Sequence, residues 1–454
     1  MQKVLIANRG EIAVRVIRAC HDLGLQTVAV YSEADKEALH VLHADEAVCI
    51  GKAPSNQSYL RIPNILSACE ITGADAIHPG YGFLAENANF ASICQSCGLN
   101  FIGPAPETIA KLGDKARAKM IAKRAGCPVI PGSNGAVNGL DEALYEAKRI
   151  GFPLFIKASA GGGGRGIRIA ESSEQFPKQF AAARAEAEVS FGNPEIYLEK
   201  LIVDPRHIEV QVLADKFGHT IHLGERDCTI QRRRQKLIEE TPSPFLSPRL
   251  RKKIGKAAVK AVQAADYYSV GTVEFLVDAD HNFYFMEVNT RIQVEHTVTE
   301  ELTGVDIVTE QIKIARGESL DIRQRDVVFD GHVFEFRVNA EDPFSNFMPS
   351  PGRLEYYLPP GGPSVRVDSA CYTGYTIPPY YDAMIAKLII KGKTREEAIE
   401  IAKRALREFH IGGIKTTIPF HLYMLQDEKF LSGDFHINTI DTLMSEGCSF
   451  STEN

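Results

Sequence analysis

The 454-residue sequence has no tryptophan, few methionines and no long apolar run. Apolar stretches such as Val4–Ala7 are far shorter than the roughly 18 residues of a membrane-spanning helix. The N-terminus also lacks a long apolar segment, so we expect no secretion signal. Charge of neither sign dominates, because 51 basic residues face 58 acidic ones for a net charge of -7. This balance gives no overall attraction to nucleic acid or to an anionic membrane, and we expect neither as a partner.

Cysteine is scattered and odd in number, with nine residues in the chain. This usage predicts free thiols in a reducing compartment, and therefore a cytoplasmic protein. Cys94 and Cys97 form a single C-x-x-C without a second pair, which favours two thiols on a helix over a zinc site. The 44% hydrophobic and 24% charged residues are ordinary for a globular protein. At roughly 150 residues per domain, the length predicts about three domains.

The first third of the chain alternates short apolar strands with amphipathic helices, which predicts a parallel, doubly wound α/β sheet. Gly24 is expected to end the first helix, Glu11–Leu23. The turn after the first strand, Asn8–Glu11, is not the G-x-G-x-x-G fingerprint, so we predict no nicotinamide or flavin site there. The predicted strands are Lys3–Ala7, Gln26–Tyr31, Ala47–Ile50, Ala76–His78 and Asn100–Ile102.

After the first third of the chain, the sequence pattern indicates three further regions. A small αβ module runs from Asp141 to about Val203. Beyond Arg206, alternating apolar residues predict a mixed or antiparallel sheet with helices. A third region starts near Val328, contains several Pro- and Gly-rich turns, and closes with a charged helix, Thr394–Glu408.

A glycine-rich segment gives the strongest local pattern. Five glycines lie between two predicted strands, with Lys157 before them and Arg165 among them. Glycine lets backbone N–H groups approach anionic oxygens closely, and the two cations add positive charge. No Gly-Lys-Ser/Thr follows, so this is not a Walker A loop, and we interpret the segment as a flap over phosphates. The alternative is a flexible linker without a ligand. The glycines are Gly161, Gly162, Gly163, Gly164 and Gly166.

Three oxygen-bearing side chains predict a metal site. Glu287 and Asn289 are two residues apart near the end of one strand, so both point to one face of the sheet. A hairpin would bring Glu274 of the preceding strand near them. Two carboxylates and an amide oxygen suit Mg²⁺ or Mn²⁺, with the alternative of an ordinary solvated face.

Two charged clusters complete the pattern. Arg291, Gln293 and Glu295 recur at spacing two, and an extended segment would direct all three one way to bind and deprotonate a small oxyanion. The alternative is a surface ion pair. Arg232–Arg234 are surrounded in sequence by four acidic residues, so we favour a bound polyphosphate or an internal ion-pair network over nucleic acid. The acidic residues are Glu225, Asp227, Glu239 and Glu240.

Together, these segments resemble biotin carboxylase, a family within the ATP-grasp superfamily, over about residues 1 to 446. The resemblance implies an α/β protein with three domains. These are an N-terminal Rossmann-like parallel-sheet domain (1–113), a central ATP-grasp module (114–328) with a mobile glycine-rich lid at about 131–203, and a C-terminal α+β domain (329–446). The segments that carry the resemblance are Ile6–Ala13, His78–Leu84, Gly113–Lys115, the glycine segment, Glu287–His296, Glu335–Glu341 and Pro379–Asp382.

The resemblance also implies a reaction: ATP phosphorylates bicarbonate to carboxyphosphate, which delivers CO₂ to biotin on a carrier protein. Glu295 would be the base, Arg337 would stabilise the biotin enolate, and Tyr81 would border the biotin site. The remaining roles are carried over in groups: Lys115, Lys157, Gly161, Gly162, Gly163, Gly164, Arg165 and Gly166 at the phosphates; Glu199, Lys200, Leu201, His207 and Gln231 at the adenine; Glu274, Glu287 and Asn289 at Mg²⁺ or Mn²⁺; and Lys236, Arg291, Gln293, Val294 and Glu295 at bicarbonate.

The family pattern has histidine where Arg234 stands, so the role of Arg234 stays open. The chain carries no Met-Lys-Met biotinylation sequence, which predicts a freestanding subunit of acetyl-CoA carboxylase, in fatty acid biosynthesis. Expected partners are a biotin carboxyl carrier protein, carboxyltransferase subunits and a second copy in a homodimer. The alternatives are the equivalent subunit of a split pyruvate or other acyl-CoA carboxylase, another ATP-grasp ligase joining a carboxylate to an amine, and a nucleotide-binding regulator without turnover.

Overall fold

The computed structural model describes residues 1–137, 139–158, 167–191, 193–447 and 450. The chain divides into two compact units. Unit 1 comprises Met1–Cys127, Arg206–Phe275 and Glu287–Asn454, and unit 2 comprises Pro128–Pro205 and Leu276–Met286. The boundaries of the three domains given above stay a prediction.

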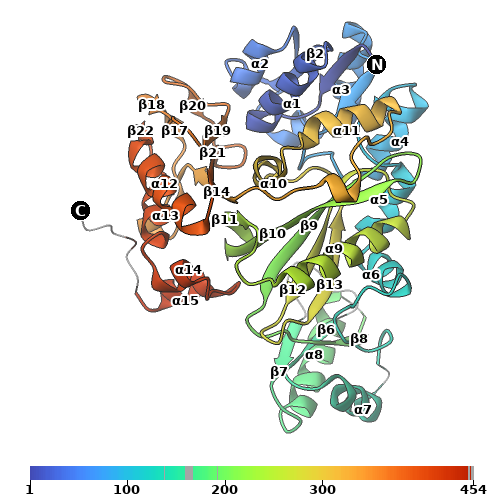
Figure 1. Ribbon diagram of the computed structural model, residues 1–454. Helices are drawn as coiled ribbons and strands as arrows, with labels where there is room; N and C mark the ends of the chain where they lie inside the picture. Colours follow the sequence, from blue (N-terminus) through green and yellow to red (C-terminus); the bar gives the residue numbers. More distant parts are fainter. Residues whose placement is uncertain (138, 159–166, 192, 448–449, 451–454) are drawn as a thin grey trace. The chain divides into compact units, whose positions relative to one another are not determined.

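Unit 1 begins with the predicted parallel sheet (Figure 1), whose strand order is β3-β2-β1-β4-β5 and whose pairs are all parallel. The prediction of a doubly wound sheet is confirmed. Its strands are β1 (Lys3–Ile6), β2 (Gln26–Ser32), β3 (Glu46–Gly51), β4 (Ala76–His78) and β5 (Asn100–Phe101). The helices of this region are α1 (Gly10–Asp22), α2 (Leu39–His43), α3 (Ile62–Thr72), α4 (Ala88–Ser96), α5 (Pro106–Gly113) and α6 (Lys115–Arg124).

Helix α1 shows how the local sequence sets one of these elements. Its apolar residues Ile12, Val16 and Ile17 recur at helical spacing and are buried. Gly24 follows the helix with φ of 69° and donates its N–H to the carbonyl of His21, as a helix-ending glycine does. The predicted end of the helix is therefore confirmed.

An eight-stranded sheet, most of whose residues belong to unit 1, has the strand order β13-β12-β9-β10-β11-β14-β21-β19. Each neighbouring pair from β9 through β10, β11, β14 and β21 to β19 is antiparallel. Antiparallel neighbours can be joined by short turns, as β10 and β11 are. The strands are β9 (Arg206–Ala214), β10 (Thr220–Arg232), β11 (Gln235–Thr241), β12 (Ser269–Val277), β13 (Phe283–Asn289), β14 (His332–Asn339), β19 (Val365–Ser369) and β21 (Met384–Gly392).

Helices cover this sheet and position its polar residues. Helix α9 packs on β9 and β10, α10 contacts β10, β11, β14 and β21, and α12 packs on β14 and β21. The helices are α9 (Pro248–Gln263), α10 (His296–Thr303), α11 (Ile307–Arg316), α12 (Arg395–Glu408), α13 (Ile418–Met424), α14 (Glu428–Ser432) and α15 (Thr439–Ser445). Short strand pairs complete the C-terminal region: β15 (Glu341–Asp342) with β16 (Met348–Pro349), β17 (Gly352–Arg353) with β20 (Thr376–Ile377), and β18 (Tyr356–Leu358) with β22 (His410–Gly412).

Unit 2 is a small αβ module. Its three-stranded antiparallel sheet has the order β7-β6-β8, from β6 (Leu154–Ala158), β7 (Ile167–Ala170) and β8 (Ile196–Lys200). Helices α7 (Leu140–Ile150) and α8 (Phe176–Phe191) pack against each other, and both contact this sheet. The predicted glycine flap falls at residues 159–166, between β6 and β7 and outside the described residues.

No helix among the described residues is long and apolar enough to cross a membrane.

Candidate active site

A buried carboxylate, Glu295, lies at the centre of the candidate site in unit 1. It is the N-cap residue of α10, and only 1% of its surface is exposed. Lys236 of β11 places Nζ 2.5 Å from Oε1, and Arg337 of β14 places Nη2 2.8 Å from Oε2. Each carboxylate oxygen therefore has its own cationic donor.

The two cations decide the protonation state of Glu295. Burial by itself would raise the pKa of this carboxyl group, because a charge is poorly solvated in the interior. Lys236 and Arg337, with Arg226 further away, hold the pKa of Glu295 well below its usual range instead. Glu295 is therefore an ionised carboxylate, able to accept a proton once a substrate competes for its cations.

Arg337 joins Glu295 to a second buried carboxylate, Glu239 of β11. Arg337 Nε donates to Glu239 Oε1 at 2.7 Å. Burial, reinforced by the negative charge of Glu295, raises the pKa of Glu239 to about 7, although Arg337 opposes the rise. Arg337 itself stays charged, because Glu239 and Glu295 more than offset the unfavourable burial of its guanidinium.

Lys236 joins Glu295 to two further carboxylates. Its Nζ lies 2.6 Å from Glu209 of β9 and 3.6 Å from Glu274 of β12. Burial disfavours the ammonium, but nearby groups including Glu209 and Glu295 hold the pKa of Lys236 well above its usual value. Lys236 is thus a fixed positive charge shared by three carboxylates.

Glu209 is anchored from the other side by Arg226 of β10, whose Nε donates to Glu209 Oε1. Arg226 is fully buried and also donates to Gln211 at 2.7 Å, Thr299 at 3.0 Å and Thr272 at 3.1 Å. Sequence reasoning missed both Glu209 and Arg226. The available indication was His207, Glu209 and Gln211 at spacing two, alternating with Ile208, Val210 and Val212, which places three polar groups on one face.

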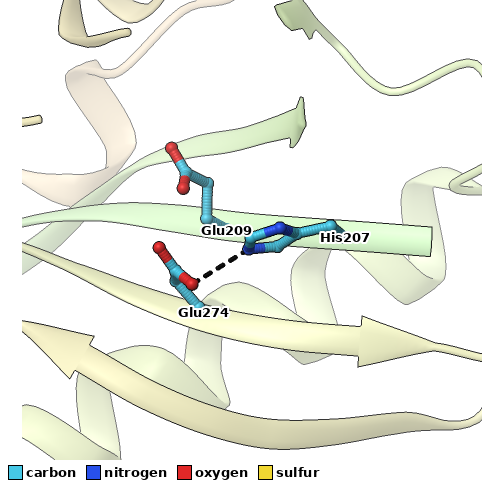
Figure 2. A group of neighbouring side chains, drawn as sticks. All are labelled: His207, Glu209 and Glu274. Atoms are coloured by element: carbon cyan, nitrogen blue, oxygen red, sulfur yellow. Dashed lines mark hydrogen bonds and ion pairs between the residues drawn. The ribbon is translucent and has the colours of Figure 1, made fainter. Parts of the chain in front are cut away.

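Figure 2 shows His207 and Glu209 on one strand and Glu274 on the neighbouring strand. His207 Nε2 lies 3.0 Å from Glu274 Oε2, and the ligand atoms of all three lie within 4.8 Å of one another. Such a group could hold a metal ion, but Glu209 already has a cationic partner in Lys236 at 2.6 Å, whereas Glu274 lies farther from that ammonium, at 3.6 Å. We interpret the group as a hydrogen-bonded network.

A second group, Glu209, Cys228 and Glu295, has similar spacing. Burial raises the pKa of the Cys228 thiol well above its usual value, so it is not a thiolate ligand. This group also belongs to the network around Lys236.

The residues predicted to bind Mg²⁺ come from the β12–β13 hairpin, as expected. Asn289 Nδ2 donates to Glu274 Oε1 at 2.8 Å, and Glu287 Oε2 lies 2.7 Å from Nζ of Lys115, at the start of α6. Two carboxylates and an amide oxygen are a donor set that fits a hard divalent cation. Lys115 and Glu287 are also less buried than the network around Lys236, so ligands from solvent can reach them.

The segment after β13 differs from its prediction. Residues 290–295 are not an extended strand: the chain bends at Arg291 and turns at Val294 and Glu295 before α10. Gln293 Nε2 donates to Glu274 at 3.0 Å and so joins the Lys236 network, together with Glu295. Arg291 instead contacts Glu86 at 3.1 Å and Asn289 at 3.2 Å. The expectation of an extended segment was therefore wrong, and Arg291 is linked to Gln293 indirectly, through Asn289 and Glu274. A common role of Arg291, Gln293 and Glu295 stays a prediction.

Three other predicted residues of unit 1 have defined partners. His207 lies between Glu274 and Gln231, whose Nε2 is 3.3 Å from His207 Nδ1. Tyr81, after β4, donates its hydroxyl to the carboxylate of Glu11 in α1. Burial, with the adjacent Glu11 charge, raises the pKa of Tyr81 well above its usual value, so the hydroxyl is a donor.

The predicted residues of unit 2 gather on its small sheet. Lys157 of β6 forms an ion pair with Glu199 of β8. Lys200 Nζ donates to the carbonyl of Phe152 at 2.7 Å, and the N–H of Leu201 donates to the carbonyl of Pro153 at 3.1 Å. Gly161, Gly162, Gly163, Gly164, Arg165 and Gly166 lie outside the described residues.

The Arg232–Arg234 segment forms the turn between β10 and β11. Arg233 and Arg234, with φ of 49° and 68°, are exposed in a two-residue hairpin turn. Arg232 contacts Asn346 and stacks on Phe347, with 4.6 Å from its guanidinium carbon to the ring centroid. The predicted ion-pair network between these arginines and the surrounding acids was therefore wrong, and the other alternative, a bound polyphosphate, stays a prediction. Those acids have other partners: Glu225 pairs with Arg251, Asp227 with Arg206, Glu239 with Arg337, and Glu240 with Arg395.

Three family descriptions match consecutive parts of the chain. "Biotin carboxylase, N-terminal domain" matches residues 1–109, "Carbamoyl-phosphate synthase L chain, ATP binding domain" matches residues 114–323, and "Biotin carboxylase C-terminal domain" matches residues 335–442. Together, the three matches span the parallel sheet, the central sheet, the small module and the C-terminal region.

Individual proteins match over nearly the whole length. Biotin carboxylase 1 of Bacillus subtilis is 58% identical over 97% of this chain and 98% of its own. A pyruvate carboxylase subunit of Methanothermobacter thermautotrophicus is 52% identical over 97% of this chain and 89% of its own. The biotin carboxylase domain dimer of Hydrogenobacter thermophilus 2-oxoglutarate carboxylase, in complex with MgADP, ADP and bicarbonate, has a TM-score of 0.88 and 50% identity, covering 100% of this chain and 99% of its own.

The parallel N-terminal sheet, the central antiparallel sheet and the cation-paired carboxylate define an ATP-dependent ligase of the ATP-grasp type. The chain belongs to the biotin carboxylase family.

Proposed function

We propose that the protein carboxylates biotin on a biotin carboxyl carrier protein, using ATP and bicarbonate, as the first half-reaction of acetyl-CoA carboxylase in fatty acid biosynthesis. The observation that carries the proposal is the ionised, buried carboxylate of Glu295 with Lys236 on one oxygen and Arg337 on the other. This arrangement places a base beside two cations. The base can accept the proton of bicarbonate while the cations hold its negative charge.

Bicarbonate is bound by Lys236, Arg291 and Gln293 and by the backbone of Val294. The anion competes with Glu295 for Lys236, which raises the basicity of the carboxylate at the moment of reaction. Glu295 takes the bicarbonate proton while a bicarbonate oxygen forms a bond to the γ-phosphorus of ATP and the bond to ADP breaks. Carboxyphosphate then separates into CO₂ and phosphate. The released phosphate takes the proton of the ureido nitrogen of biotin, and this nitrogen forms a bond to CO₂.

Arg337 serves the second step. When the ureido nitrogen of biotin loses its proton, negative charge develops on the ureido oxygen, and a guanidinium is the side chain that cannot lose its own charge there. The contact between Arg337 and Glu295 supports this role, because it couples the base of the first step to the cation of the second. Tyr81 borders the biotin.

Nucleotide binding is proposed from the family resemblance. In unit 1, Lys115, His207 and Gln231 are nucleotide contacts, and Glu274, Glu287 and Asn289 would hold Mg²⁺ or Mn²⁺, which neutralises phosphate charge when bound. In unit 2, the corresponding residues are Lys157, the segment Gly161–Gly166, Glu199, Lys200 and Leu201. The complex of the Hydrogenobacter thermophilus domain with MgADP and bicarbonate supports this proposal.

The physiological assembly is proposed as a cytoplasmic homodimer that works with carboxyltransferase subunits. The dimer of the Hydrogenobacter thermophilus domain supports the homodimer. A second assembly, the biotin carboxylase subunit of a split pyruvate carboxylase, is favoured by the 52% identity to the Methanothermobacter thermautotrophicus protein. Transfer of carboxyl groups from the carboxylated carrier to acetyl-CoA or to pyruvate, with the carboxyltransferase of the same cell, distinguishes the two.

The test of the function is phosphate release from ATP with Mg²⁺, with and without bicarbonate and free biotin. We expect release to require bicarbonate and Glu295→Gln to reduce it by about two to three decades. Glu301→Gln, on the same helix and paired with Arg366, is the matched control and should keep wild-type rates. Release that is independent of bicarbonate, or absent in a folded preparation, would contradict the proposal.

A further inference from the structure

A fully buried lysine, Lys387, contacts the segment that carries Glu295. Lys387 lies in the middle of β21 and is 0% exposed. Its Nζ donates to the carbonyl oxygen of Val294 at 2.9 Å and lies 3.1 Å from Oε2 of Glu11 in α1. A buried ammonium is costly unless it is paired and hydrogen-bonded, so these two contacts account for its presence. One of them ends on the residue immediately before Glu295.

The strand register places Lys387 directly opposite Arg337. β14 and β21 are antiparallel with Arg337 and Lys387 as partners, and opposed side chains lie on one face of the sheet. Arg337 binds the carboxylate of Glu295, and Lys387 binds the preceding carbonyl, that of Val294. Two neighbouring cations of the sheet therefore fix two consecutive residues of the bicarbonate segment.

Glu11 balances the charge of Lys387 and extends the cluster to Tyr81. Oε2 of Glu11 faces Lys387, and Oε1 accepts the Tyr81 hydroxyl. Burial works against the charge on Lys387, but Glu11, together with Glu335 and Asp368, holds the pKa of Lys387 above its usual value. The side chain is therefore an ammonium with three available N–H donors.

We propose that Lys387, with its charge balanced by Glu11, is a positioning residue for the bicarbonate step: it holds the Val294–Glu295 peptide in the orientation that presents Glu295 to the substrate. The inference rests on the proposed function, because it takes Glu295 as the base that accepts the bicarbonate proton. It requires no contact between Lys387 and bicarbonate. Small displacements of a base from its substrate are enough to slow proton transfer. Loss of the hydrogen bond from Lys387 to Val294 should therefore raise the KM for bicarbonate.

Four variants separate positioning from stability. Lys387→Met removes the donor to Val294 and leaves Glu11 buried without its cation, whereas Glu11→Gln leaves the donor in place. The double variant Lys387→Met/Glu11→Gln removes both charges, which typically restores most of the stability lost by breaking a buried pair. Lys391→Met is the matched control: Lys391 lies on the same strand and also bonds a backbone carbonyl, that of Glu301, and a carboxylate, that of Asp330.

Hydrogen exchange of the full-length protein gives a readout that does not depend on activity. The amides of His296 and Val298 donate to the carbonyls of Gln293 and Glu295, so they report on the turn that Lys387 anchors. We expect these amides to exchange about tenfold faster or more in the double variant, and at the wild-type rate in Lys391→Met. Unchanged exchange in a folded double variant would overturn the inference, whatever the protein's activity.

The second readout is the KM for bicarbonate in ATP cleavage, alongside thermal melting. We expect Lys387→Met and the double variant to raise this KM about tenfold or more with little change in KM for ATP, even where melting recovers in the double variant. Recovery of the melting temperature and of the KM for bicarbonate together, in the double variant, would make Lys387 a structural ion-pair partner only.

If neither methionine variant folds, Glu11→Gln tests the inference. A KM for bicarbonate within about twofold of wild type supports it, and a tenfold rise overturns it. Wild-type protein without bicarbonate-dependent cleavage would refute the proposed function alone, since the exchange experiment still tests Lys387.

Discussion

Replacing Arg337 by methionine should separate the two steps of the reaction. The substitution keeps most of the buried apolar stem and removes the guanidinium that donates to Glu239 and Glu295. Because Arg337 is proposed to act on the biotin oxygen, carboxylation of biotin should fall most. Bicarbonate-dependent ATP cleavage should fall less, since Lys236 still holds Glu295.

The size of the effect follows from the contacts. A charge-assisted donor lost from a transition state costs about 3–4 kcal/mol, or about two to three decades in rate. Removal of Arg337 also leaves Glu239 and Glu295 buried without that cation, and breaking a buried pair destabilises by about 3–5 kcal/mol. Arg337→Met/Glu239→Gln removes one of those charges and should recover part of the melting temperature without restoring biotin carboxylation.

The assay measures both rates on one preparation, with melting temperature as the control. Phosphate release without biotin reports the bicarbonate step, and carboxybiotin formation reports the whole reaction. Equal loss of both rates in a well-folded Arg337→Met protein would refute the separate role of Arg337. It would indicate instead that the arginine only orders Glu295.

Glu287→Gln should reduce turnover about tenfold or more and raise the Mg²⁺ concentration needed, with an unchanged melting temperature; a wild-type Mg²⁺ dependence would remove Glu287 from the metal site. Burial lowers the pKa of His40 from 6.5 to about 4, so unfolding takes up a proton at His40 in this range, and this residue alone should lower the free energy of unfolding by about 1.4 kcal/mol per pH unit as the pH decreases from 6.5 towards 4. His40→Gln should melt with a shallower dependence on pH, and an equally steep one would contradict the assignment. Arg226→Met should destabilise by about 3–5 kcal/mol, because it removes the buried guanidinium that pairs with Glu209 and leaves only Lys236 facing that carboxylate, and addition of Glu209→Gln should recover part of the loss in thermal melting.

The sequence was a good guide wherever local pattern determines structure. Short apolar strands separated by amphipathic helices predicted the parallel sheet, and Gly24 predicted the end of α1, because both depend on neighbouring residues. The hairpin that brings Glu274 near Asn289 was predictable for the same reason. Glu295 was named from its spacing to Arg291 and Gln293, and Lys236 and Arg337 through family resemblance, while the contacts among Glu295, Lys236 and Arg337 required the fold.

The errors concern the partners of charged residues. Arg291 turns to Glu86, which is 205 positions away in the sequence, and no spacing rule indicates such a partner. The acids around Arg232–Arg234 are paired by residues of other elements, as Glu240 is by Arg395. Lys387 was missed because a single lysine in an apolar strand predicts neither burial nor contact with Val294, which lies 93 positions away. Tertiary packing decides these pairings.

Transfer of radiolabelled bicarbonate to free biotin tests the central claim most directly. The full-length protein with ATP and Mg²⁺ should convert biotin to an acid-labile labelled product, and Glu295→Gln should lose this activity by about two to three decades in a preparation that melts cooperatively and is folded at the assay temperature. Glu301→Gln should form the product at the wild-type rate. No labelled biotin from a folded wild-type preparation, or undiminished labelling by Glu295→Gln, would contradict the account.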